Sequence, residues 1–196
     1  MSIGSLTVSR KLQGIKLMKF IKVAFYCLVL ALPYSTHAQA KSGQATLESL
    51  HGFVQNFYDW YVPNALSDSA DSAWNLALKV KGSVFSHQLA RALREDSAAQ
   101  AEAEGEIVGL DFDPFLNSQD PGEHYKVGRI TQKDDSYWVD IHSVSSSGRV
   151  YEKPSVVAEV VRKNGQWHFV NFHYSSGNDL LGVLKELKES REKPSS

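Results

Sequence analysis

The chain has 196 residues, of which 42% are hydrophobic and 22% are charged, and its formal net charge is −1. All 22 acidic residues but only 16 of the 21 basic residues lie after Ala40, so the chain from Lys41 onward has a net charge of −6. A surface of that sign repels phosphate backbones and argues against nucleic-acid binding. Cys27 is the single cysteine, so the chain after Ala40 can form neither a disulfide nor a zinc-thiolate site.

The first forty residues have the pattern of a secretory signal peptide. Lys19 and Lys22 precede an apolar run over residues 23–32, and Ala38-Gln39-Ala40 supplies an A-x-A cleavage site. The run is shorter than the about 20 apolar residues that a membrane span requires. The residues before Cys27 are too bulky for a lipoprotein cleavage box. We therefore expect an exported protein, periplasmic or secreted, that is cleaved after Ala40 and does not span the membrane.

Residues 41–196 are expected to form one domain, because a chain of this length can bury roughly 70% of its unfolded surface in one core. Met18 is an alternative start that would give a signal peptide of ordinary length. The charged tail after Lys188 is expected to fray.

Apolar spacing predicts three helices in the first half of the chain. The first covers residues 46–62 and is ended by Pro63. The second covers residues 73–80. Ser86 is a suitable N-cap for the third, over residues 87–104. The later half of this third helix is rich in alanine and acidic residues, so most of it is expected to face water.

After residue 122 the apolar period changes from near four to two, which predicts strands. Asn164-Gly165 is a strong signal for a two-residue hairpin between the last two strands. A short helix after Asn178 ends the domain. The expected strands cover residues 125–130, 137–142, 156–162 and 166–174.

Helices followed by a strand meander predict an α+β fold, with N-terminal helices packed on a curved antiparallel sheet of about four strands and a short C-terminal helix. The segment NGQWHFVNFHYSSG and the helix FVQNFYDWYV resemble the last strand and the opening helix of the nuclear transport factor 2-like superfamily. That resemblance implies a cone-like sheet whose mouth often holds a ligand.

A second resemblance rests on DPF-x-x-x-QD, formed by Asp113, Pro114, Phe115, Gln119 and Asp120. Together with the opening helix, this motif is similar to the bacterial domain of unknown function typified by the lipoprotein YbjP. The resemblance implies a fold and a compartment but no catalytic residues. Membrane anchoring does not carry over, because the lipoprotein cleavage box is missing.

The stretch over residues 110–122 has two interpretations. Asp113 before Pro114 has the pattern of an N-cap followed by proline at the first helical position. Asp120-Pro121-Gly122 has the composition of a tight turn. Alternatively, oxygen ligands could converge on a calcium ion, although the spacing does not fit an EF-hand. The residues of that alternative are Asp111, Asp113, Asn117 and Asp120.

Asp140 and His142 are candidates for catalysis, because they lie two residues apart on one predicted strand and an Asp–His pair can act as a general base. The alternative is that both are hydrogen-bonded or exposed on the sheet. No spacing typical of a metal site is present, and no cofactor is expected.

Aromatic residues provide candidates for a binding pocket. From the superfamily resemblance, His168, Val170, Phe172 and Tyr174 are expected to point into the cone. Aromatic walls with a few polar groups suit a small apolar ligand, but they suit a filled core equally well. The candidate pocket residues are Tyr58, Tyr61, His168, Phe172 and Tyr174.

These patterns predict an exported, non-catalytic domain that binds an envelope protein or a small apolar ligand. The alternatives are an isomerase-like or dehydratase-like enzyme that uses the cone with Asp140 or His142 as base, and a calcium-stabilised structural module. The sequence leaves the oligomeric state open.

Overall fold

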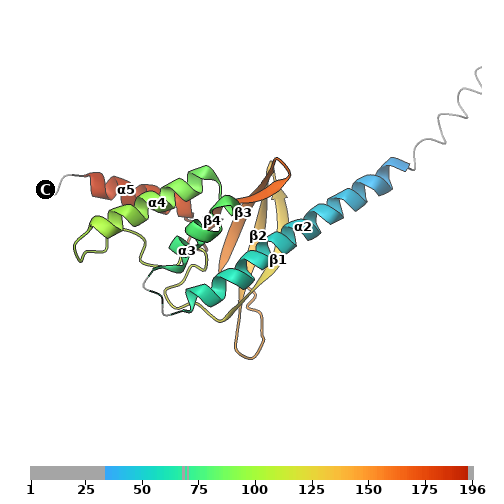
Figure 1. The fold of residues 1–196 in the computed structure, drawn as a ribbon. Helices are drawn as coiled ribbons and strands as arrows, with labels where there is room; N and C mark the ends of the chain where they lie inside the picture. Colours follow the sequence, from blue (N-terminus) through green and yellow to red (C-terminus); the bar gives the residue numbers. More distant parts are fainter. Residues whose placement is uncertain (1–33, 68, 70, 194–196) are drawn as a thin grey trace, which may run out of the picture. The chain divides into compact units, whose positions relative to one another are not determined.

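The computed structural model describes residues 34–67, 69 and 71–193, and side chains from Gly43 onward. The predicted signal peptide therefore lies largely outside the described residues. The chain divides into two units, Met1–Thr46 and Leu47–Ser196. Helices precede a four-stranded antiparallel sheet and a last helix, which confirms the predicted α+β class (Figure 1). The elements are α2 (Tyr34–Ala65), α3 (Ala73–Val80), η1 (Gly82–Val84), α4 (His87–Glu102), β1 (His124–Lys133), β2 (Ser136–Val144), β3 (Val156–Lys163), β4 (Gln166–His173) and α5 (Leu180–Glu192).

The sheet is a meander in the order β1-β2-β3-β4. Asn164 and Gly165 have φ angles of 52° and 80° and join β3 to β4. Positive φ at both positions is the requirement of a type I′ turn, so the predicted hairpin is confirmed. Asp134 has a φ of 49° and opens a second two-residue connection, between β1 and β2. This hairpin was not predicted, since Asp134 is followed by aspartate instead of glycine.

The helices agree with the predictions in α3 and at the start of α4, and they differ in α2. The Ser86 hydroxyl accepts a hydrogen bond from the Leu89 N–H at 3.2 Å, which confirms the N-cap. The prediction that Pro63 ends the first helix is wrong, because α2 continues to Ala65. Proline close to a helix end removes a single backbone donor, and the Leu66 N–H still reaches the Val62 carbonyl at 3.1 Å.

One face of α2 and one face of the sheet enclose the core. Phe57 on α2 lies with its ring centroid 4.8 Å from that of Phe169 on β4, so the helix and the last strand interlock through aromatic rings. Val139, Ile141 and Ala158 are fully buried on the central strands. The helix contributes Leu50, Val54, Phe57, Tyr58 and Tyr61 to this core.

Gln55 on α2 reaches the edge strand β1. Its Nε2 donates to the Tyr125 carbonyl at 3.1 Å, and its Oε1 accepts from the Val127 N–H at 2.9 Å. One side chain thus bonds to two backbone groups of β1 on the side opposite β2.

Asp96 is an exception to the prediction that the later half of α4 faces water, since its exposed fraction is 1%. Its Oδ2 accepts from the Leu110 N–H at 2.9 Å, and its Oδ1 accepts from the Arg191 guanidinium at 2.7 Å. Arg191 also donates to the Val108 carbonyl at 2.8 Å. This pair ties α5 to α4, so the helix continues past Lys188, where fraying was expected, to Glu192.

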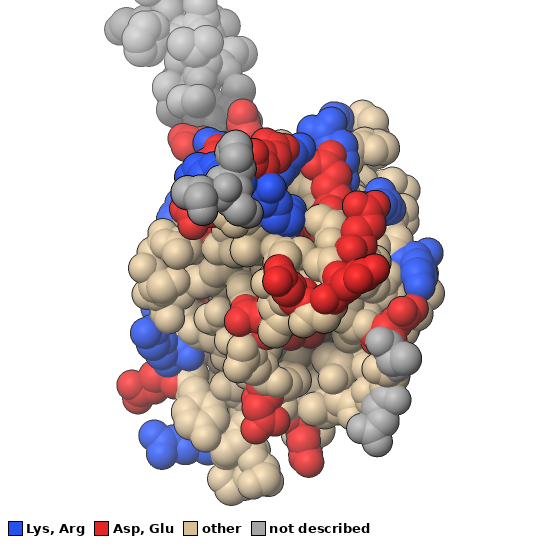
Figure 2. Space-filling view, turned by 90° about the vertical axis from the view of Figure 1, so that its left-hand side faces the viewer, with Lys and Arg blue, Asp and Glu red and all other residues tan. Residues whose placement is uncertain are grey.

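Exposed glutamates occupy the end of α4 and the loop after it, at Glu102, Glu104 and Glu106. Figure 2 views the molecule from the side where α4 ends and shows acidic side chains in a band across this face, consistent with the negative charge counted from the sequence. Within the described residues, no helix combines the length and apolarity that crossing a membrane requires.

Candidate functional site

Asp113 organises the stretch that carries the DPF motif. Its Oδ1 accepts hydrogen bonds from the N–H groups of Phe115 and Leu116 at 2.9 and 3.0 Å. The Asn117 N–H closes the turn on the Asp113 carbonyl at 2.8 Å. Pro114 fits the first helical position, where no donor is needed. The predicted capping bonds of Asp113 are therefore present, but residues 114–117 form a single turn and not the helix that the N-cap prediction implied.

The rest of this stretch departs from the predicted turn. Residues 120–122 form no hydrogen-bonded turn, and the Asp120 N–H instead donates to the Ser118 hydroxyl at 3.1 Å. Gln119 donates to the Asp111 carbonyl at 3.1 Å, and both side chains are exposed.

Three tyrosine hydroxyls donate hydrogen bonds to the DPF turn, the turn that begins with Asp113, Pro114 and Phe115. Tyr58 donates to the Phe115 carbonyl at 2.9 Å, and Tyr174 donates to the Pro114 carbonyl at 3.0 Å. Tyr61 donates to Asp113 Oδ2 at 2.6 Å. Both carboxylate oxygens of Asp113 therefore have protein donors. Within the described part of the chain, no group of three or more His, Cys, Asp or Glu side chains could hold a metal ion.

Phe115 fills the place where the sequence suggested an apolar pocket. Its ring centroid lies 4.8 Å from that of Phe172 and 5.2 Å from those of Tyr61 and Phe85. Phe115 and Phe172 have no exposed surface. Four of the five candidate pocket residues are thus core residues, three of which also donate to the DPF turn.

The fifth candidate, His168, does not point into the core. The pairing of β3 with β4 shifts between Glu159 and Val160, so that Val170 is an extra residue in β4. An extra residue reverses the alternation of faces. Trp167 and Phe169 are therefore buried before the bulge, whereas His168 lies on the other face with Nδ1 3.0 Å from the Ser83 carbonyl. The prediction that His168 and Val170 point inward is wrong for this reason.

Asp140 and His142 are half-buried on the sheet face opposite the core. They flank Gly128, where a Cβ would lie 2.5 Å from His142 Nε2 and 3.4 Å from the Asp140 Cβ. His142 Nδ1 lies 2.8 Å from the Tyr151 carbonyl. The two side chains are thus neighbours of a close-packed strand, and neither lines the cleft described next.

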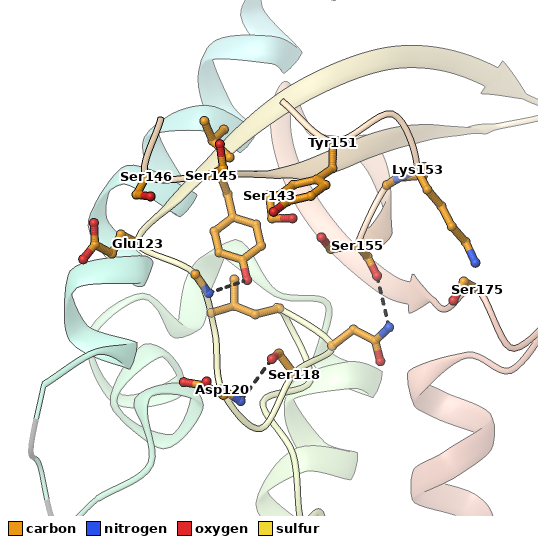
Figure 3. A pocket seen from close by; sticks show the side chains of 16 residues that line it. Ser118, Asp120, Glu123, Ser143, Ser145, Ser146, Tyr151, Lys153, Ser155 and Ser175 are labelled. Carbon is orange, nitrogen blue, oxygen red and sulfur yellow. Dashed lines mark hydrogen bonds between the residues drawn. The ribbon is translucent and has the colours of Figure 1, made fainter. Parts of the chain in front are cut away.

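An open cleft of about 670 Å³ lies where the end of the stretch over residues 110–122 meets the connection between β2 and β3. Asn117 donates to the Ser155 carbonyl at 3.1 Å, which joins the two walls. The Tyr151 N–H donates to the Ser143 carbonyl at 3.1 Å and fixes the far wall. Figure 3 shows Tyr151 and Ser143 close together on this side of the cleft. Six serines line the cleft: Ser118, Ser143, Ser145, Ser146, Ser155 and Ser175.

The cleft also contains one exposed aromatic ring and three charged side chains. Tyr151 is 51% exposed. Asp120 and Glu123 contribute carboxylates, and Lys153 contributes an ammonium group. Asn117 and Asp120 were named from the sequence, whereas Tyr151, Glu123, Lys153 and the six serines were not. The available signal was the concentration of serines in residues 143–147.

Comparison of the sequence with protein-family models gave no match, and comparison with curated proteins gave none. Among solved structures, the chain is similar to a protein of unknown function from Bacteroides thetaiotaomicron. The two share 19% sequence identity over 70% of this chain and 98% of that chain, with a TM-score of 0.48. Similarity at this level assigns neither a family nor a function.

The pKa of Asp113 gives the DPF turn a testable dependence on pH. Burial raises this pKa from 3.8 to about 6, against the opposing effect of the Tyr61 and backbone hydrogen bonds. Between pH 3.8 and 6 the folded state binds more protons than the unfolded state, so this group's contribution to stability falls as the pH rises.

Asp113→Asn keeps the capping oxygen but does not titrate. We therefore expect the free energy of unfolding of Asp113→Asn, measured relative to that of the wild type, to rise by about 2–3 kcal/mol from pH 4 to pH 7. Urea unfolding at both pH values measures this difference. Parallel pH profiles for the two proteins would contradict the assignment.

Proposed function

We propose that this chain is an exported, non-catalytic domain that binds a small polar ligand in the serine-lined cleft. The carrying observation is the cleft itself, an open space of about 670 Å³ with hydroxyl walls and an exposed tyrosine. Its volume falls within the about 300–1,000 Å³ typical of ligand sites. The filled core around Phe115 and Phe172 favours this surface site over the apolar interior pocket suggested by the sequence.

The positions of Asp140 and His142 support a binding role over catalysis. Both are placed on the outer sheet face, and neither is among the residues that line the cleft. A general base has to reach its substrate within hydrogen-bonding distance or through one water. A ligand in the cleft would therefore meet hydroxyls, one aromatic ring and a few charges.

Tyr151→Ala is expected to weaken ligand binding about tenfold, because truncation of an aromatic anchor costs on the order of 1–2 kcal/mol. Its backbone bonds to Ser143 and His142 do not depend on the ring, so the fold should remain intact. Ile107→Ala is the matched control, since Ile107 is 76% exposed and does not line the cleft. NMR titration with tri-alanine, maltotriose and a fatty acid provides the measurement.

Equal affinities for wild type and Tyr151→Ala would remove the cleft as the site. Binding of the fatty acid alone would restore the apolar-ligand hypothesis.

The proposal of export is supported by the basic residues Lys19 and Lys22, the apolar run over residues 23–32 and the Ala38-Gln39-Ala40 site. We expect the protein recovered from the periplasm or medium to begin at Lys41. Intact mass and N-terminal sequencing check this expectation. A recovered chain that still carries Cys27 would contradict it.

A further inference from the structure

The charges of the cleft are separated by sign. Figure 3 shows Glu123 and Asp120 on one side and Lys153 on the other, with serines between them. No salt bridge among the described residues includes any of these three charges. Charged groups on a binding surface favour ligand groups of opposite sign and fix the direction in which a ligand lies. The cleft therefore suits a ligand with a positive end and a negative end.

The middle of the cleft suits the backbone of a peptide. The hydroxyls of Ser143, Ser155 and Ser175 make no hydrogen bond to another described residue. A serine hydroxyl offers one donor and two acceptor lone pairs. It can therefore bond to either the N–H or the C=O of an amide. Tyr151 adds an exposed ring against which a small side chain can pack.

Resting on the proposed function, we infer that the ligand of the cleft is a short peptide with free ends. Its amino group lies toward Asp120 and Glu123, and its carboxylate lies toward Lys153. Each end forms a solvent-exposed ion pair, a contact usually worth about 0.2–1 kcal/mol. Each end is therefore expected to change the affinity about 1.5- to 5-fold.

The test is an NMR titration of protein purified from cells that express the full chain. The probes are tri-alanine, N-acetyl-tri-alanine, tri-alanine amide and maltotriose. Blocking either end of tri-alanine is expected to weaken binding about 1.5- to 5-fold. The loss of affinity on acetylating the amino end should disappear in the double variant Asp120→Asn/Glu123→Gln. The loss of affinity on amidating the carboxyl end should disappear in Lys153→Gln. Glu106→Gln and Lys163→Gln, which change the same charges at exposed positions outside the cleft, should retain both effects.

The outcomes separate the ligand class from the cleft. If maltotriose binds as well as tri-alanine, or if both end-blocked peptides do, with shifts at cleft residues, the inference of a peptide with free ends is overturned and the proposed function stands. If the end effects survive in the cleft variants, the inferred orientation is overturned. If neither tri-alanine nor maltotriose shifts cleft residues, both the inference and the proposed binding of a polar ligand there are overturned.

Discussion

Phe115→Ala is expected to lower the free energy of unfolding by about 3–5 kcal/mol, the usual cost of truncating a fully buried phenylalanine. Phe115 is completely buried and contacts rings from α2, from β4 and from the segment before α4. Its loss would leave a cavity at the centre of the aromatic core. Urea unfolding followed by circular dichroism measures the change. Phe112→Ala is the matched control and should cost less, because Phe112 is half-buried and has one ring contact, with Tyr174.

The same variant tests whether the core is filled. Cavities lined by apolar side chains stay dry and can bind benzene. We therefore expect benzene to raise the melting temperature of Phe115→Ala and to leave that of the wild type unchanged. A similar stabilisation of the wild type would show that the native core already has room for an apolar ligand.

Arg191→Ala is expected to lower the free energy of unfolding by about 3–5 kcal/mol, because it leaves the Asp96 carboxylate buried without its cation. Asp96 is 1% exposed, and the Arg191 side chain is 18% exposed, so water cannot readily replace the guanidinium. Lys188→Ala is the matched control on the same helix. The Lys188–Glu95 pair has side chains that are 52% and 47% exposed, and its loss should cost at most about 1 kcal/mol.

A double-mutant cycle with Asp96→Asn separates the interaction energy of the Asp96–Arg191 pair from the other contributions of Arg191, including its bond to the Val108 carbonyl. Arg191→Ala should cost much less in the Asp96→Asn background, where no buried charge remains. An Arg191→Ala variant as stable as Lys188→Ala would refute the buried-pair interpretation.

Local signals predicted the elements whose causes are local. Ser86 and Asp113 cap the N–H groups two or three residues later, and Asn164-Gly165 supplies the two positive φ angles of its turn. Asp96 could not be recognised in this way, because its cation lies 95 residues further along the chain. An acid in an alanine-rich helix is indistinguishable in sequence from one on a solvated face.

The candidate site was less predictable than the fold. The inward direction of His168 was inferred from parity with the last strand of the resembling superfamily, and the extra residue Val170 reverses that parity. The tyrosines were recognised as important, but their hydroxyl partners, Phe115 and Pro114, depend on how a distant loop packs. The cleft joins segments brought together only by the fold, and its serines have no fixed spacing.

The double hydrogen bond from Gln55 bears on how this domain avoids aggregation. β1 is an edge strand, and unpaired backbone groups on such an edge invite pairing with another polypeptide. The amide of Gln55 offers one donor and one acceptor to Tyr125 and Val127, which is what an incoming strand would offer. An amide side chain thereby occupies two of the positions through which a neighbouring copy could extend the sheet.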